Sequence, residues 1–284
     1  MHDFNFLWLC VTALIGGAVN SIAGGGTLIT FPALLAALTP VHGSSAAVFA
    51  NATSTVALVP GSFAAAWGYR QKLRDARRWL VLLIVPSLVG GVIGSLLLTR
   101  LNPAYFDALV PWLILIATLL LLIDSLRRRK PAGPERTEHS RRSIVGLIAF
   151  QLGVSIYGGY FGAGIGILML ASLAMMGIGD INRMNAVKTV LTVGINGVSV
   201  VIFVLGGDVL WEYALPMAAA SILGGYLGAK LALRIHPRQV RIFVILIGFT
   251  LAGYYFYKKL NATPAVSNPP AHAARLADLT TRSC

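Results

Sequence analysis

The chain has 284 residues, of which 56% are hydrophobic and only 12% are charged. Soluble domains carry about 25% charged residues, so this composition excludes an ordinary soluble protein and indicates a helical protein that crosses a membrane several times. The net charge of +13 lies in short basic clusters beside apolar segments. The positive-inside rule and anionic lipids account for such clusters, and no basic, aromatic-interleaved domain supports nucleic-acid binding.

The apolar segments form two series of five, and we expect a helix for each segment. The two short segments, 26–38 and 164–177, cannot cross a hydrocarbon core of ~30 Å, so we interpret them as re-entrant or broken segments. The other eight are expected to be transmembrane helices, which gives an all-α polytopic membrane protein. The expected helices cover residues 6–23, 26–38, 44–67, 79–98 and 105–126, then 143–161, 164–177, 184–205, 211–233 and 240–257. We interpret the first as a retained span, because no Lys or Arg precedes its apolar core as in a signal peptide.

The two series are related by an internal duplication. When Gly24 is aligned with Gly162, Gly26 falls on Gly164 and several apolar neighbours also coincide. Further along, the cluster 90–94 matches 224–228, and an Arg and a Pro that follow each cluster stay in register. We therefore expect two homologous halves. The expected parts are a first transmembrane repeat at 1–126, a basic cytoplasmic linker at 127–142, a second repeat at 143–260 and a disordered tail at 261–284.

The distribution of Lys and Arg predicts the orientation of the halves. Loops 68–78, 127–142 and 234–241 are basic and should be cytoplasmic, whereas loop 206–210 has no base and should lie outside. These assignments fit if each region that contains a break enters and leaves on the same side, which makes the chain an inverted repeat. Lys258 and Lys259 fall outside in this scheme. A parallel four-plus-four arrangement places them inside, but it moves three arginines of loop 234–241 outside.

Each short segment begins at a glycine-rich break. In lipid, an unwound backbone is tolerated only where protein buries it or where it lines a wet cavity, and paired breaks in two halves indicate a transport site. A half-helix that starts at the break directs its free N–H groups and its positive dipole end toward the break, so an anion is favoured there. Close helix packing is the alternative explanation, and it is preferred for the clusters 90–94 and 224–228. The candidate residues at the breaks are Asn20, Ser21, Gly24, Gly25, Gly26, Thr27, Gly162, Ala163 and Gly164.

The spans that follow the breaks contribute further polar candidates. Asn51 and Thr55 lie in the first of them, and Asn185, Lys188 and Thr192 lie on one face of the second. An ionisable residue within a membrane span is a functional hypothesis by default, and Lys188 could pair with an anion. Alternatively, Lys188 extends to the interface near the start of its span. The sequence has no metal-ligand spacing, nucleotide fingerprint or nucleophile–base pair, so we expect no cofactor, no enzymatic activity and no ATP-driven transport.

These motifs resemble those of the sulfite exporter TauE/SafE family of membrane permeases. The resemblance rests on residues 23–26 followed by Pro32, on 159–164, and on the stretch from Asn185 to Thr189, and it extends from about residue 6 to 257. The second break departs from a plain glycine run at Ala163 and Ile165, so the half-sites are expected to contribute unequally. The resemblance implies export of sulfite or small organosulfur anions such as sulfoacetate across the inner membrane.

The sequence therefore predicts a secondary transporter of small anions in the cell inner (plasma) membrane. Substrate would pass by alternating access between the two halves, around the paired breaks. A channel-like anion pore and a non-transporting integral-membrane assembly protein are the alternatives. The expected partners are a small anion and the lipid bilayer, while coupling to protons or another ion and assembly into a homo-oligomer are left open.

Overall fold

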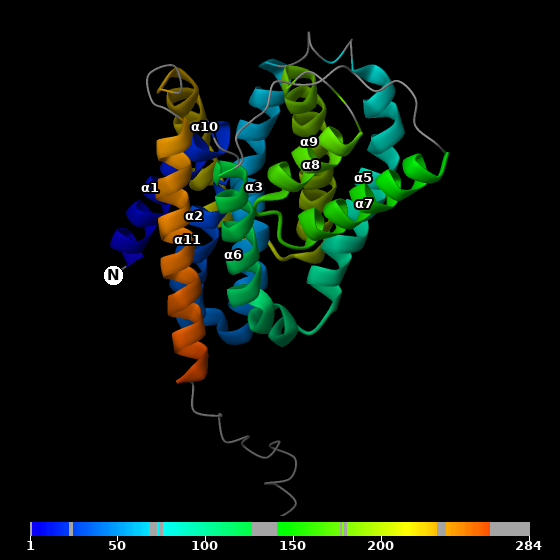
Figure 1. Cartoon of the computed structure of the whole chain (residues 1–284). Helices are drawn as coiled ribbons and strands as arrows, with labels where there is room; N and C mark the ends of the chain where they lie inside the picture. The colour runs from blue at the N-terminus through cyan, green and yellow to red at the C-terminus, as the bar shows by residue number, and fades with distance from the viewer. Residues whose placement is uncertain are drawn as a thin grey trace, which may run out of the picture.

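The computed structural model describes residues 2–22, 25–68, 73, 76–126, 141–176, 178, 181–231 and 237–261. Throughout these residues the regular structure is helical, which confirms the expected all-helical fold (Figure 1). Gly24, nearly all of the linker 127–142 and the tail after Asn261 lie outside the described residues. The elements are α1 His2–Ile22, α2 Thr27–His42, η1 Gly43–Ser45, α3 Ala46–Gly68, α5 Arg77–Arg100, α6 Pro103–Leu126, α7 Arg141–Tyr160, α8 Ile165–Met175, α9 Ile181–Gly206, α10 Trp211–Leu231 and α11 Pro237–Leu260.

Several of these helices are long and apolar enough to cross a membrane. Five helical stretches meet this condition by length and composition, and three shorter helices are also apolar. The expected total of eight spans, which includes α10, stays a prediction. The five stretches are Thr27–Phe63, Arg77–Arg100, Pro103–Leu126, Arg183–Gly206 and Gln239–Leu260, and the shorter helices are Phe6–Asn20, Ile144–Tyr160 and Ile165–Met175.

The first short segment is longer than the sequence predicted. We expected it to end at Leu38, before Pro40, but α2 continues through this proline to His42. A proline inside a helix removes one backbone hydrogen bond, and a Thr hydroxyl nearby can satisfy a carbonyl of the same turn. Pro40 leaves the carbonyl of Ala36 without its usual N–H donor, and the hydroxyl of Thr39 donates to the adjacent carbonyl of Leu35. The helix ends instead at Gly43, whose φ is +54°.

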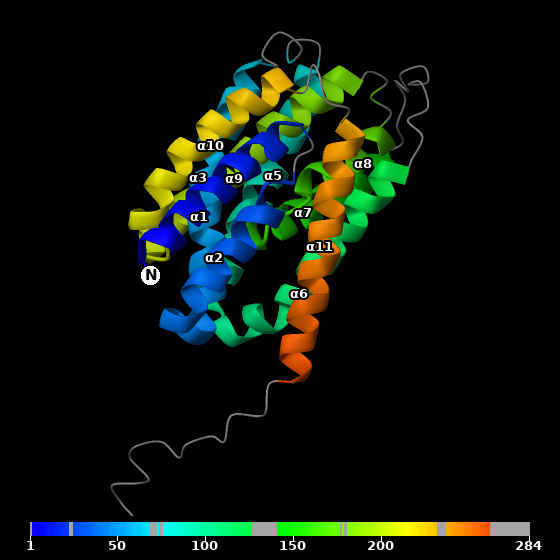
Figure 2. The ribbon, with the colours of Figure 1, turned by 90° about the vertical axis from the view of Figure 1, so that its left-hand side faces the viewer.

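The most extensive helix contacts join the two halves of the sequence. Helix α1 packs along α10, and α5 packs along α7 (Figure 2). Helix α5 also contacts α9, and α10 also contacts α3. By the internal alignment α1 corresponds to α7, α3 to α9 and α5 to α10, so each of these contacts has a counterpart in the other half. The two halves are therefore interleaved, with one helix of each half packed among helices of the other.

Glycines allow these cross-half contacts. A Cβ on Gly90 would lie 2.8 Å from the carbonyl oxygen of Leu152 in α7, and a Cβ on Gly94 would collide with the same helix at Ile156. A Cβ on Gly224 of α10 would collide with the backbone of α1 at Leu14. The backbones of these helices can approach only because the side chain is absent. The interpretation of these glycines as packing residues is confirmed.

Helices α6 and α11 lie side by side and run antiparallel. Near the end of α6, Asp124 forms an ion pair with Arg241, which lies near the start of α11. Toward the other end of the pair, the ring of Trp112 packs edge-on against Phe256 with centroids 5.0 Å apart. The internal alignment pairs Pro103, at the start of α6, with Pro237, at the start of α11, so two helices that it matches run in opposite directions here.

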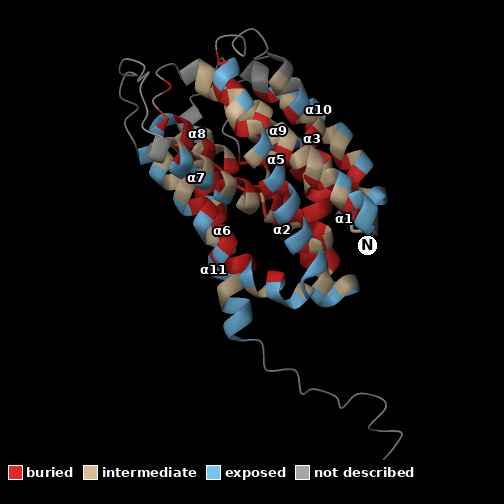
Figure 3. Cartoon of the chain, turned by 90° about the vertical axis from the view of Figure 1, so that its right-hand side faces the viewer, coloured by how far each residue is buried: buried red, intermediate tan, exposed pale blue. Residues whose placement is uncertain are grey.

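Buried hydrophobic side chains form two clusters, while many large apolar side chains are exposed. Figure 3 marks the buried and exposed residues along the ribbon. One cluster joins α5, α7, α8 and the first part of α9. The other joins α1, α2, α3, α6, α10 and α11, together with the ends of α5 and α9 and the second break. The clusters follow the cross-half packing rather than the order of the chain.

Candidate functional site

The second break has a defined backbone geometry. Helix α7 ends at Tyr160, where the N–H groups of Phe161 and Gly162 both donate to the carbonyl of Tyr157. Gly162 and Gly164 have φ values of +78° and +75°. An L-residue in this region costs about 1–2 kcal/mol, so the two glycines permit the turn between α7 and α8. The chain thus changes direction within four residues.

Side chains from three helices hold the second break in place. The hydroxyl of Tyr157 donates to the carbonyl of Ala163 at 2.7 Å, across the turn. The hydroxyl oxygen of Ser95, from α5, lies 3.4 Å from the carbonyl oxygen of Gly159, with closer contacts to Gly91 O at 2.8 Å and Ser199 Oγ at 2.7 Å. Asn51, from α3, donates through Nδ2 to the carbonyl of Tyr160 at 3.2 Å. The carbonyls around the end of α7 therefore have donors from both halves of the chain.

The side chain of Asn51 has one unpaired polar atom. Asn51 is 1% exposed, and its Oδ1 has no hydrogen-bond partner among the described residues. The carbonyl of Tyr160 can only accept a hydrogen bond, so the atom of Asn51 that faces it must be the nitrogen. The other atom of the carboxamide, which has no partner, is therefore the oxygen Oδ1. Since the two atoms belong to one carboxamide, this buried acceptor lies beside the end of α7.

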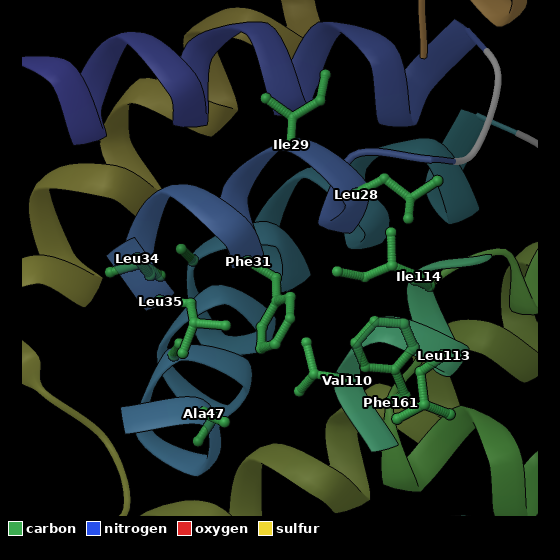
Figure 4. Packing of buried hydrophobic residues seen from close by; sticks show 14 of the residues in the cluster. Leu28, Ile29, Phe31, Leu34, Leu35, Ala47, Val110, Leu113, Ile114 and Phe161 are labelled. Carbon is green, nitrogen blue, oxygen red and sulfur yellow. The ribbon is translucent and has the colours of Figure 1, made fainter. Parts of the chain in front are cut away.

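Aromatic packing embeds the second break in the core around α2 and α6. The ring of Phe161 lies edge-on to Phe31 of α2, with centroids 5.3 Å apart, and 6.3 Å from the ring centroid of Phe106 in α6. Figure 4 shows Phe31 and Phe161 among Leu28 of α2 and Ile114 of α6. The break of the second half is thus fixed against the first half.

The first break is described from Gly25 onward. The carbonyl of Gly25 accepts from Leu28 N, and that of Gly26 accepts from Ile29 N, so α2 starts directly at the break. Gly26 lies against the backbone of Gly16 in α1, where a Cβ would not fit. Thr27 is half-buried in the first turn. The side chain of Ser21, like Gly24, lies outside the described residues.

Polar contacts connect the helices around the first break to α3. The Nδ2 group of Asn20, in α1, donates to Ser62 Oγ at 3.3 Å. The hydroxyls of Thr30, in α2, and Ser54, in α3, are 2.6 Å apart. Both contacts are part-buried or buried, so α3 carries hydrogen-bond partners for the helices on either side of the break.

The two breaks approach adjacent turns of one helix. A Cβ placed on Gly25 would lie 3.4 Å from Leu121 Cδ1, and a Cβ placed on Gly164 would lie 3.6 Å from Ala117 Cα. Residues 117 and 121 are four positions apart in α6, so they share one face of that helix. The N-terminal ends of α2 and α8 therefore meet the same stretch of α6.

Lys188 lies against the first turn of α8. A Cβ placed on Gly166, the second residue of α8, would be 3.5 Å from Lys188 Cδ and 3.9 Å from its Nζ. The side chain is half-buried. The ammonium group is thus close to the N-terminal end of α8, where the helix dipole is also positive. Two positive features together favour an anion.

The other candidates on the spans after the breaks differ in position. The hydroxyl of Thr192 donates to Met169 Sδ, in α8, at 3.6 Å, so Thr192 and Lys188 both face α8. The hydroxyl of Thr55 donates to the backbone carbonyl of Asn51 at 2.8 Å. Asn185 is half-buried in α9, and among the described residues no hydrogen bond joins its side chain to either break. The structure therefore brings Asn51, Lys188 and Thr192 to the second break and α8, while the role of Asn185 stays a prediction.

Two features of the site were missed in the sequence. Asn51, Ala52 and Thr55 match Asn185, Ala186 and Thr189 with the same offset that relates Gly90 to Gly224. Both threonine hydroxyls donate to the carbonyl of the asparagine four residues earlier, at 2.8 and 2.7 Å. This repeated spacing could have been found by comparing the halves.

The second missed feature is Tyr157, whose hydroxyl closes the turn at Ala163. A tyrosine just before a glycine-rich segment gives no clear signal in the sequence, because only the fold shows where its hydroxyl points.

A polytopic helical protein whose two glycine-rich breaks pack against adjacent turns of one helix has the architecture of a membrane transporter. The family model described as sulfite exporter TauE/SafE matches residues 9–255, and the chain belongs to this family. The resemblance inferred from the glycine motifs is confirmed. The chain is thus a multi-pass membrane transporter rather than an enzyme.

Curated bacterial relatives match over nearly their whole length. The chain is 30% identical to a probable membrane transporter protein of Haemophilus influenzae over 90% of this chain and 95% of the relative. It is 28% identical to the probable membrane transporter protein YfcA of Escherichia coli K12, over 90% and 95%. It is 25% identical to the probable membrane transporter protein YunE of Bacillus subtilis, over 87% and 97%. These bacterial relatives place the chain in the cell membrane.

Proposed function

We propose that the chain is a secondary transporter that exports small anions of the sulfite and organosulfonate type. The substrate would bind where the two breaks approach α6. The description of the family as sulfite exporters supports this substrate class. The chemistry of the site supports the sign of the charge, since helix N-termini and a lysine both stabilise anions.

One observation carries this proposal. Gly25 and Gly164 pack on adjacent turns of α6, at Leu121 and Ala117, so that the starts of α2 and α8 both lie against this stretch of α6. Several first-turn N–H groups bond to carbonyls of the breaks themselves, so each start faces its break with the positive end of the helix dipole. Lys188, against the first turn of α8, adds a full positive charge on one side only. The proposed site is therefore shared by the two halves but is not symmetric.

Transport would proceed by alternating access in an inverted repeat. A twofold axis that relates two antiparallel helices is perpendicular to them, as in an inverted repeat. The antiparallel packing of α6 and α11 therefore supports inversion. The interleaved packing supports two moving bodies, one built on α1, α3 and α10 and the other on α5, α7 and α9. Rocking of one body against the other would expose the site first to one side and then to the other.

Flux measurements in proteoliposomes test the proposal. The purified full chain is reconstituted, and the flux of sulfite, ethanesulfonate, chloride and a neutral sugar is measured with and without an imposed pH gradient. We expect flux of sulfite and ethanesulfonate above that of protein-free vesicles, and no flux of the sugar. No anion flux under either condition would contradict the proposal, and a response to the gradient would identify proton coupling.

A further inference from the structure

The unpaired acceptor of Asn51 lies beside the proposed anion site. The Asn51 side chain is 1% exposed, and the structure describes no hydrogen-bond donor for its Oδ1. A buried polar atom without a partner costs about 1–3 kcal/mol, so such an atom in a native fold calls for an explanation. The Nδ2 group of the same carboxamide is held by the carbonyl of Tyr160, so the side chain cannot turn to relieve the cost.

We propose that Asn51 Oδ1 accepts a hydrogen bond from the transported substrate, so that the site selects anions that also carry a hydrogen-bond donor. This inference rests on the proposed function and specifies its substrate class. The hydrogen sulfite ion and hydroxyalkanesulfonates have such a donor. The sulfite dianion and simple alkanesulfonates have only acceptors.

The placement of charges around the second break fits a substrate that has an anionic group and a hydrogen-bond donor. On the α8 side, the first turn of the helix and the ammonium group of Lys188 present positive charge. On the α7 side, the helix ends at Tyr160, where the dipole is negative, and Asn51 adds an acceptor. An anion with its charged group toward α8 and an O–H group toward α7 would satisfy both sides of the four-residue turn.

A metal cation is a weaker explanation for the acceptor. The carbonyls of Tyr160 and Ala163 each already accept from a side chain, namely from Asn51 and Tyr157. A cation at Oδ1 would find few free carbonyl oxygens nearby, and the NH₂ group of Asn51 would repel it. A hydrogen-bond donor on a bound anion needs no free carbonyl oxygen nearby and is not repelled by the NH₂ group.

Gln151 provides a matched control within the same chain. It is also a fully buried carboxamide, and its Oε1 also has no partner in the described part of the structure. Its Nε2 donates to Ser87 Oγ at 3.0 Å in the contact between α5 and α7, more than two helical turns before the break. Its replacement therefore removes a buried amide without touching the proposed site.

The test compares ethanesulfonate with 2-hydroxyethanesulfonate, which differ by one hydroxyl group. Inhibition of sulfite flux by each anion is measured in proteoliposomes with the wild type, Asn51→Leu, Asn51→Asp and Gln151→Leu. We expect the wild type and Gln151→Leu to prefer the hydroxylated anion roughly tenfold, the value of one good hydrogen bond in a dry site. Asn51→Leu should be inhibited about equally by the two anions, because it lacks the acceptor. Asn51→Asp, which keeps an acceptor, should retain the preference with weaker binding of both anions.

The outcomes separate this inference from the proposed function. If the wild type transports anions but does not distinguish the two sulfonates, the acceptor role is wrong and the transporter proposal stands. The same holds if Asn51→Leu keeps the full preference. If no variant and no wild type transports any anion, both are overturned. If Asn51→Leu does not fold, the comparison of the two sulfonates with the wild type still tests whether the site prefers an anion with a hydrogen-bond donor.

Discussion

The side chain of Lys188 lies along Gly166, so that the ammonium group of α9 reaches the first turn of α8. Lys188 lies about two turns into α9, which begins at Ile181, and Gly166 provides the space across which its methylenes run. The contact joins a charge and a helix N-terminus into one positive region at the second break.

Replacement of Lys188 with Met should lower anion transport. Met has a similar length and no charge, so the packing against Gly166 is kept while the charge is lost. A hydrogen bond to a charged group contributes about 1.5–3 kcal/mol, which corresponds to a roughly 10–100-fold loss of apparent affinity. Sulfite flux in proteoliposomes measures the effect. Lys259→Met at the exposed end of α11 is the control and should transport normally; equal flux by both variants would exclude the role of Lys188.

Substitutions of Gly166 should be graded by size. A Cβ at this position would lie 3.5 Å from Lys188 Cδ, an ordinary van der Waals distance, so Gly166→Ala should transport nearly as well as the wild type. Gly166→Leu occupies the space of the lysine side chain and should displace the ammonium group, with a loss comparable to that of Lys188→Met. Apparent affinity for sulfite is the measurement. Full activity of Gly166→Leu would show that the position of the ammonium group does not matter.

The glycines of the second break should resist substitution for a conformational reason. Gly164 has a φ of +75°, where an alanine costs about 1–2 kcal/mol, so Gly164→Ala should lower the free energy of unfolding by that amount. At Gly146, inside α7, a Cβ would meet no atom within 4 Å, so Gly146→Ala should be neutral or stabilising by up to about 1 kcal/mol. Thermal unfolding in detergent compares the two variants. Equal stability of both would mean that the left-handed turn is not maintained in solution.

A disulfide between α5 and α9 tests the proposed moving bodies. The hydroxyl oxygens of Ser95 and Ser199 are 2.7 Å apart, which is close enough for a cysteine pair to bridge. In a background without native cysteines, Ser95→Cys with Ser199→Cys should form a disulfide, and sulfite flux should persist after oxidation, because both helices would move together. Flux that is lost on oxidation and restored by reduction would show instead that α5 and α9 move relative to each other.

The sequence predicted local structure well because the helices are marked by apolar length and by glycine breaks. It misplaced the end of α2 by four residues, since Pro40 is accommodated within the helix and Gly43 ends it. The packing of α5 against α7 was out of reach, because sequence periodicity shows which face of a helix is apolar but not which helix covers it. The same limit applies to Asn51, whose partner Tyr160 is 109 residues away.

Accelerated exchange of sulfite is the most direct test of the central claim, that this chain is an anion carrier with one site opened alternately by two interleaved bodies. Proteoliposomes are loaded with unlabelled sulfite or left empty, and the entry of labelled sulfite is followed with the wild type and Lys188→Met. We predict that internal sulfite accelerates entry through the wild type and has little effect with Lys188→Met. Entry at the same rate into loaded and empty vesicles would indicate a channel, and no entry would contradict anion transport altogether.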